Sequence, residues 1–290
     1  MKQLKSVRGV YRSGSTHMVG DGFPVRNIFP SHNLTEEISP FLLLDYAGPA
    51  YFPPTDLPRG VGEHPHRGFE TVTIVYQGNV VHRDSAGHAG TIGPGDVQWM
   101  TAASGVVHEE LHEPVFAKQG GTLQMIQLWV NLPRVAKMGP PRYQTLLNEN
   151  IPQSPLGGTA GSIRVIAGEY QGMMGPAKTF SPVHLYDLIL QTGHQTDLIL
   201  PVGFNTGLFV LSGRVVINRS EEVGEAQMAL CDPNGTQINI ETGEEARVLV
   251  LCGQPIHEPV ARMGPFVMNT EEELVQAVND YRAGRMGHLD

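Results

Sequence analysis

Short apolar runs separated by glycine, proline, asparagine and aspartate recur along this chain, and they constrain its fold more than any other feature. Such runs, rich in Val, Ile, Leu and Tyr, are typical of strands in a β-sandwich or β-barrel. With 34 glycines and 22 prolines among 290 residues, turns are frequent enough to separate many strands. The sequence therefore predicts an all-β protein, with strands at 41–46, 71–77, 80–82, 97–100, 123–132, 185–190, 208–211, 215–218 and 248–252.

One helix is predicted, near the C-terminus. Thr270 is followed three residues later by Glu273, which is the pattern of a capping box at a helix start. Apolar residues at helical spacing come next, and Gly284 offers a stop. We therefore expect a single C-terminal α-helix of about 13 residues.

A weak internal repeat indicates two similar domains. Residues 75–81 and 210–216 both read as an apolar strand, a tight glycine turn and a second apolar strand. A length of 290 residues is about twice that of a common domain. We therefore predict two tandem jelly-roll-like β-barrels, residues 1–135 and 136–290, with the boundary in the proline-rich stretch 133–141 and the helix ending the second barrel.

Composition excludes several classes of function. Charged residues make up 17% of the chain, the net charge is −9 and lysine and arginine do not cluster, so direct nucleic-acid binding is not expected. No run approaches the ~18 apolar residues of a membrane span, and the first twenty residues lack the apolar stretch of a signal peptide. Cys231 and Cys252 lie in apolar runs and are expected to be reduced core residues. A cytoplasmic location follows.

The candidate chemistry is concentrated in the first half of the chain. His64 and His66 are separated by one residue, a spacing that turns both side chains to one face of a strand. His108 and Glu110 repeat this spacing after a further strand and turn. A single His-x-His pair arises easily by chance among 12 histidines, but the combination predicts a metal site of three histidines and one carboxylate. Glu70 also has the required parity, so spacing alone leaves the carboxylate open between Glu70 and Glu110.

These motifs resemble those of a known superfamily and, more closely, of one family within it. The spacing of His64, His66, Glu70 and Gly78, followed by Gly93-x-Gly-Asp96 and Gly105-x-x-His108, resembles the two motifs of the cupins. More specifically, the chain resembles pirins in four segments, in both halves: HPHRGFET at 64–71, GDVQWMTA at 95–102, LWVNL at 128–132 and GPFVMNT at 264–270.

The resemblance implies a bicupin whose N-terminal barrel holds iron and whose C-terminal barrel has lost its metal. The residues agree: His64 and His66 stand 14 and 12 residues before Gly78, and the same offsets before Gly213 reach Ile199 and Pro201, which cannot ligate. For the fourth ligand the resemblance implies Glu110 rather than Glu70.

Three imidazoles and one carboxylate suit Fe²⁺, and also Mn, Ni, Co or Cu, and they leave coordination positions open for catalysis. The pirin resemblance implies quercetin 2,3-dioxygenase activity, in which O2 cleaves the ring of a flavonol and releases carbon monoxide, with Glu110 assisting as a base. It also implies an alternative: an iron-dependent, redox-responsive regulator that binds a protein partner, either a transcription factor or a metabolic enzyme.

Three further side chains receive structural interpretations. His82, which follows the Gly78 turn, is expected to hydrogen-bond at a barrel end rather than to bind metal. His112 is in phase with His108 but is expected to lie beyond the strand end, in solvent. Trp129 is expected in the core.

Overall fold

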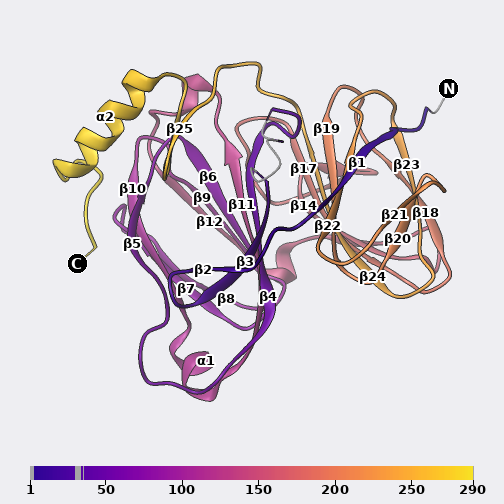
Figure 1. The fold of residues 1–290 in the computed structure, drawn as a ribbon, viewed down its shortest axis with the longest axis horizontal. Coiled ribbons are helices and arrows are strands. Elements are labelled where there is room, and N and C mark those ends of the chain that lie inside the picture. Colours follow the sequence, from indigo (N-terminus) through magenta and orange to yellow (C-terminus); the bar gives the residue numbers. More distant parts are fainter. Residues whose placement is uncertain (1–2, 30–33, 35, 290) are drawn as a thin grey trace. The chain divides into compact units, whose positions relative to one another are not determined.

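The computed structural model describes residues 3–29, 34 and 36–289, which form two compact units (Figure 1). We call them the N-terminal unit (Ser15–Asn27, Phe41–Asn148 and Ile256–Asp290) and the C-terminal unit (Met1–Gly14, Ile28–Pro40 and Glu149–Pro255). Strands dominate both units, so the predicted all-β fold with an α-helix near the C-terminus is confirmed.

The N-terminal unit is built around two larger β-sheets that share a core. Their strand orders are β12-β9-β6-β11-β4-β3-β2 and β5-β10-β7-β8. Val75 and Met125 of the first sheet pack in one apolar cluster with Val80 and Ile92 of the second. The strands are β2 (His17–Val19), β3 (Phe23–Phe29), β4 (Phe41–Phe52), β5 (Gly60–His66), β6 (Phe69–Gln77), β7 (Val80–Asp84), β8 (Ala89–Ile92), β9 (Val97–Thr101), β10 (Val106–His112), β11 (Gly121–Asn131) and β12 (Arg142–Leu146), with helix α1 (Pro114–Gln119) and the 3₁₀ turn η1 (Arg134–Ala136) between them.

The C-terminal unit repeats this architecture with a different interior. Its sheets have the orders β1-β22-β19-β24-β17-β14-β13 and β18-β23-β20-β21. Apolar side chains from both sheets fill the space between them, and the free thiols of Cys231 and Cys252 are buried among these. The elements are β1 (Val7–Arg12), η2 (Asn148–Asn150), β13 (Gln153–Leu156), β14 (Gly161–Ala167), β15 (Glu169–Tyr170), β16 (Met173–Met174), β17 (Val183–Leu190), β18 (Gln195–Ile199), β19 (Asn205–Ser212), β20 (Val215–Ile217), β21 (Glu221–Val223), β22 (Gln227–Cys231), β23 (Gln237–Glu241) and β24 (Ala246–Gly253).

The predicted C-terminal helix is α2 (Glu271–Arg282), and the capping box of Thr270 and Glu273 is formed at its start. It is preceded by a hairpin of β25 (Ala261–Met263) and β26 (Phe266–Met268). Leu274 of α2 and Phe266 of the hairpin share an apolar cluster with Val107. Val107 and His108 are consecutive residues of β10, so their side chains point to opposite faces of the sheet. The cluster therefore covers the face that lies opposite His108. No helix in the described part of the chain is long and apolar enough to span a membrane.

The two units differ from the predicted ranges 1–135 and 136–290 at both termini. Strand β1 pairs with β22 and extends the large sheet of the C-terminal unit. The segment Ile256–Asp290, with the hairpin and α2, belongs instead to the N-terminal unit. Each terminal segment covers backbone or apolar surface that would otherwise be exposed, namely the edge of β22 and the outer face of β10.

Candidate metal centre

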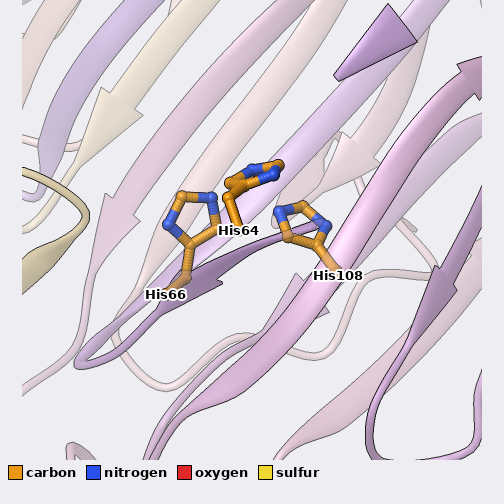
Figure 2. A group of neighbouring side chains, drawn as sticks. All are labelled: His64, His66 and His108. Carbon is orange, nitrogen blue, oxygen red and sulfur yellow. The ribbon is translucent and has the colours of Figure 1, made fainter. Parts of the chain in front are cut away.

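Two neighbouring strands bring the three predicted histidines together. Strands β5 and β10 pair antiparallel, with His64 directly opposite His108 and His66 opposite Val106. The ring centroids of His64 and His108 lie 4.2 Å apart, and each lies 4.8 Å from that of His66. Figure 2 shows the three rings gathered around one space, and their ligand atoms all lie within 4.8 Å of one another.

The hydrogen bonds of these rings fix which nitrogen faces that space. The Nδ1 atom of His64 lies 2.8 Å from the carbonyl oxygen of Gly62, and that of His66 lies 3.4 Å from the carbonyl oxygen of Pro265. Since a carbonyl can only accept, Nδ1 must carry the proton in both rings and Nε2 keeps its lone pair. Backbone carbonyls hold metal-binding histidines in the same way in metal sites generally.

His108 has a histidine as its hydrogen-bond partner in place of a carbonyl. Its Nδ1 lies 3.0 Å from Nε2 of His82, while its own Nε2 is buried without a hydrogen-bond partner. An unpaired buried polar atom is costly, and a bound cation is one of the few groups that would satisfy it. The donor set therefore fits a metal ion.

Burial keeps these imidazoles in their ligating form. Desolvation lowers the pKa of His64, and it lowers the pKa values of His66 and His108 well below the ordinary value, with mutual repulsion among the rings as a smaller cause for the last two. A neutral imidazole has the free lone pair that a metal needs, so no protons have to be displaced from these rings at neutral pH.

Glu110, the predicted fourth ligand, lies outside the group formed by the three histidines. Its Oε1 lies 3.1 Å from Oγ1 of Thr73, which in turn lies 2.8 Å from Oε1 of Gln127. The threonine hydroxyl has one proton, so it donates to only one of these two oxygens at a time. Burial raises the pKa of Glu110 to about 7. Its part in binding metal remains a prediction.

The alternative carboxylate, Glu70, lies on the other face of its strand. Along β6, Glu70 and Thr73 are an odd number of residues apart, so Glu70 points away from the face that contacts Glu110. Its Oε1 accepts a hydrogen bond from Oγ1 of Thr101 at 2.7 Å, and Arg142 lies 3.9 Å away. Burial raises the pKa of Glu70 to about 7. This placement favours Glu110 over Glu70.

His82 is closer to the site than the sequence indicated. It is 3% exposed in β7, and besides its contact with His108 its ring stacks on Tyr143, with centroids 5.1 Å apart. His88 stacks on the same tyrosine at 5.6 Å. One sequence signal would have located His82. It stands two residues after Val80 and therefore shares the face of the strand that the apolar Val80 marks as inward.

The expectation that His112 is solvated is wrong. Strand β10 continues to His112, which is 3% exposed. Its Nε2 lies 2.9 Å from the carbonyl oxygen of Gly22, and its ring packs edge-on against Phe23 and Phe52. His112 therefore closes the far end of the strand and is no part of the cluster.

Trp129 of β11 connects the cluster with the C-terminal hairpin. Its ring lies 5.2 Å from that of His66 and 4.2 Å from that of Phe69. The guanidinium of Arg262 lies over the same ring, 5.0 Å from its centroid. Trp129 is partly exposed, so the prediction of a core residue describes only its packing against Phe69.

Comparisons with known proteins agree with the motifs. Residues 22–130 match the pirin family model and residues 185–287 match that of the pirin C-terminal cupin domain. The chain is 54% identical to "Putative quercetin 2,3-dioxygenase PA2418" of Pseudomonas aeruginosa, over 97% of this chain and 98% of the relative, and 34% identical to mouse pirin, over 87% and 84%. A crystal structure of quercetin 2,3-dioxygenase from Acinetobacter baumannii, 48% identical, superposes with a TM-score of 0.96 over 99% of this chain and 100% of that one.

Proposed function

The chain belongs to the pirin family, and on that premise we propose that it is a metal-dependent dioxygenase that opens the ring of quercetin or a related flavonol with O2. The observation that carries this proposal is the convergence of three neutral imidazoles whose Nδ1 atoms are all held by hydrogen bonds. The names of the relatives from Pseudomonas and Acinetobacter support the same reaction.

In this proposal Nε2 of His64, His66 and His108 binds the metal, with the carboxylate of Glu110 as the fourth ligand. The set suits Fe²⁺, with Mn, Ni, Co and Cu as alternatives. When bound, the metal would act as a Lewis acid that makes the 3-hydroxyl of the flavonol more acidic. The C-terminal barrel, with Ile199 and Pro201 at the corresponding positions, would serve as scaffold.

The side chains around the metal would accept the proton of the flavonol 3-hydroxyl and define the side from which substrate approaches. Burial raises the pKa of Glu110 to about 7 without metal, and a bound cation would favour its carboxylate form, which is the form that a general base requires. Thr73 and Gln127 provide a hydrogen-bonded path from its Oε1 into the sheet. His66 and His108 are buried and His64 is half-buried, so substrate would approach the metal from the His64 side.

Metal analysis of the purified protein, followed by oxygen uptake with a panel of flavonols, tests the proposal. We expect His64→Ala and His108→Ala to lose both the metal and the flavonol-dependent oxygen uptake and release of carbon monoxide. His194→Ala serves as a control because His194 is a half-buried residue of the C-terminal unit whose partners are Thr159 and Thr192. Oxygen uptake that persists in metal-free His64→Ala or His108→Ala would refute the proposal.

A further inference from the structure

The hairpin β25–β26 is attached directly beside the metal-binding strand. The backbone N–H of Arg67 donates to the carbonyl oxygen of Pro265 at 3.4 Å, and that of Val267 donates back to the carbonyl oxygen of Arg67 at 3.0 Å. The carbonyl oxygen of Pro265 also accepts from His66. These bonds join residues about 200 positions apart and fix the hairpin next to His66.

Arg262 extends from this hairpin over Trp129. Its guanidinium is 5.0 Å from the ring centroid of Trp129, and that ring in turn contacts His66. Within the part of the chain that the structure describes, no carboxylate lies at ion-pair distance from Arg262, and the residue is exposed. Stacking occupies one face of the guanidinium and leaves N–H donors on its edge available.

The sheet beneath Arg262 presents a polar, partly exposed face. Asp45, Gln127 and Thr73 stand side by side in register across β4, β11 and β6, and Trp129 lies two residues along β11 on the same face. Asp45, Gln127 and Trp129 are half-buried, whereas Thr73 is buried. Solvent therefore reaches this face near Arg262, and the row of residues ends at Thr73, which contacts Glu110.

One acidic side chain, Asp45, lies on this face. Its carboxyl accepts a hydrogen bond from Asn27 at 2.6 Å, and burial raises its pKa. Partial burial lowers the pKa of Arg262, and the nearby Asp45 opposes that shift. Arg262 stays a cation at neutral pH, because a guanidinium titrates far above that pH.

We propose that Arg262 and Trp129 form a subsite that binds the anionic group of an aromatic substrate and selects ionised over neutral ring compounds. The inference rests on the proposed function, since acidic flavonols are the aromatic anions that the reaction would use. The edge of the guanidinium donates hydrogen bonds to an ionised hydroxyl or an acidic substituent. The exposed edge of Trp129, whose ring faces contact Arg262 and Phe69, lies against the adjoining ring of the substrate.

Binding of two probes to zinc-loaded protein tests this subsite without turnover, because zinc is redox-inert. The probes are a sulfonated flavonol, which is an anion at all working pH values, and an unsubstituted, neutral flavone. Isothermal titration calorimetry compares wild type with Arg262→Met, which keeps the length but loses the charge, and with Arg262→Lys, which keeps the charge but loses the planar fork. Arg214→Met, an exposed arginine of the C-terminal unit paired with Glu222, is the control.

We expect Arg262→Met to weaken binding of the sulfonated flavonol by about tenfold and binding of the flavone by less than about twofold, with Arg262→Lys in between. High salt should weaken anion binding in wild type and leave Arg262→Met nearly unchanged. Equal affinities of wild type and Arg262→Met for the sulfonated flavonol, or equal losses for both probes, would overturn the inference. Matching thermal unfolding of all variants confirms that they are folded.

A separate assay distinguishes the inference from the proposed function. Oxygen uptake with quercetin is measured on the iron-loaded wild type. If uptake is absent while Arg262→Met still loses affinity for the anion, the proposed reaction fails and the subsite stands. If uptake is present while Arg262→Met binds the anion as wild type does, the subsite fails and the reaction stands.

Discussion

His82 and His108 lie on neighbouring strands with Nε2 of His82 3.0 Å from Nδ1 of His108. For His108 to bind metal through Nε2, its Nδ1 must carry the proton and donate it to Nε2 of His82. His82 must then be protonated on Nδ1. In that arrangement His82 accepts the proton of His108 Nδ1 and fixes the orientation of the His108 ring.

Replacing His82 with phenylalanine should weaken metal binding without removing a ligand. The ring can still stack on Tyr143, but it cannot accept a hydrogen bond from His108. Loss of such an outer partner costs about 10- to 100-fold in metal affinity, measurable by competition with a chelator. His88→Phe is the matched control, because His88 stacks on the same tyrosine and bonds to Asp84. Equal affinities of the two variants would contradict the assigned role.

Metal binding should stabilise the folded protein through the histidine cluster. A ligand that binds only the native state at 100 times its dissociation constant adds about 2.7 kcal/mol to the free energy of unfolding. We expect Zn²⁺ or Fe²⁺ to raise the thermal midpoint of wild type and of His194→Ala, and EDTA to reverse the shift. His64→Ala should show little shift, and an undiminished shift in that variant would place the metal elsewhere.

The ion pair of Arg67 and Asp280 should stabilise the strand end that carries His66. Arg67 Nη1 lies 2.7 Å from Asp280 Oδ2, and the arginine side chain is 4% exposed. Asp280→Asn leaves this buried cation without its counter-charge, so we expect the free energy of unfolding to fall by about 3 kcal/mol. Glu271→Gln, an exposed change on the same helix, should have a small effect.

This ion pair also predicts that the free energy of unfolding falls at acidic pH. The hydrogen bond from Arg67 is the main cause that lowers the pKa of Asp280 to about 2, below its unfolded value of about 3.9. The contribution of the ionised Asp280 to the free energy of unfolding is therefore full above about pH 4 and is lost as pH falls toward 2. Urea titrations of wild type and Asp280→Asn should converge over that range, and a difference that persists at pH 2 would contradict this explanation.

Glu70 should show the opposite dependence on pH. Its pKa of about 7 in the folded protein lies above the unfolded value near 4.3, so its contribution to stability is full below about pH 4 and is lost as pH rises through 7. Glu70→Gln removes this titration. Relative to the variant, wild type should lose up to about 3 kcal/mol between pH 4 and pH 8. A constant difference across this range would show that Glu70 stays ionised.

Glu149→Gln removes an exposed carboxylate and so controls for the effect of net charge in the comparison of wild type with Glu70→Gln. Glu110 titrates in both wild type and Glu70→Gln, so its contribution cancels in the comparison. Chemical denaturation at each pH gives the free energy of unfolding directly.

The sequence by itself determined the local features of this protein. Alternation along a strand placed His64 and His66 on one face and predicted that His108 would join them, because side-chain direction in a strand depends only on residue spacing. The capping box at Thr270 predicted the start of α2 in the same local way. The repeated strand–turn–strand patterns were sufficient to predict two barrels.

The tertiary structure decided the features that depend on which segments meet. The register between β5 and β10 shifts after His108, so Glu110 lies opposite Val61, and spacing could not predict this irregularity. His66 meets Pro265 across 199 residues, and Arg67 meets Asp280 across 213. Residue spacing specifies the face of the strand to which a side chain points, but not which distant segments contact that face. Those contacts depend on the burial of whole apolar surfaces. For that reason only the fold revealed that the C-terminal hairpin lies against the histidine cluster.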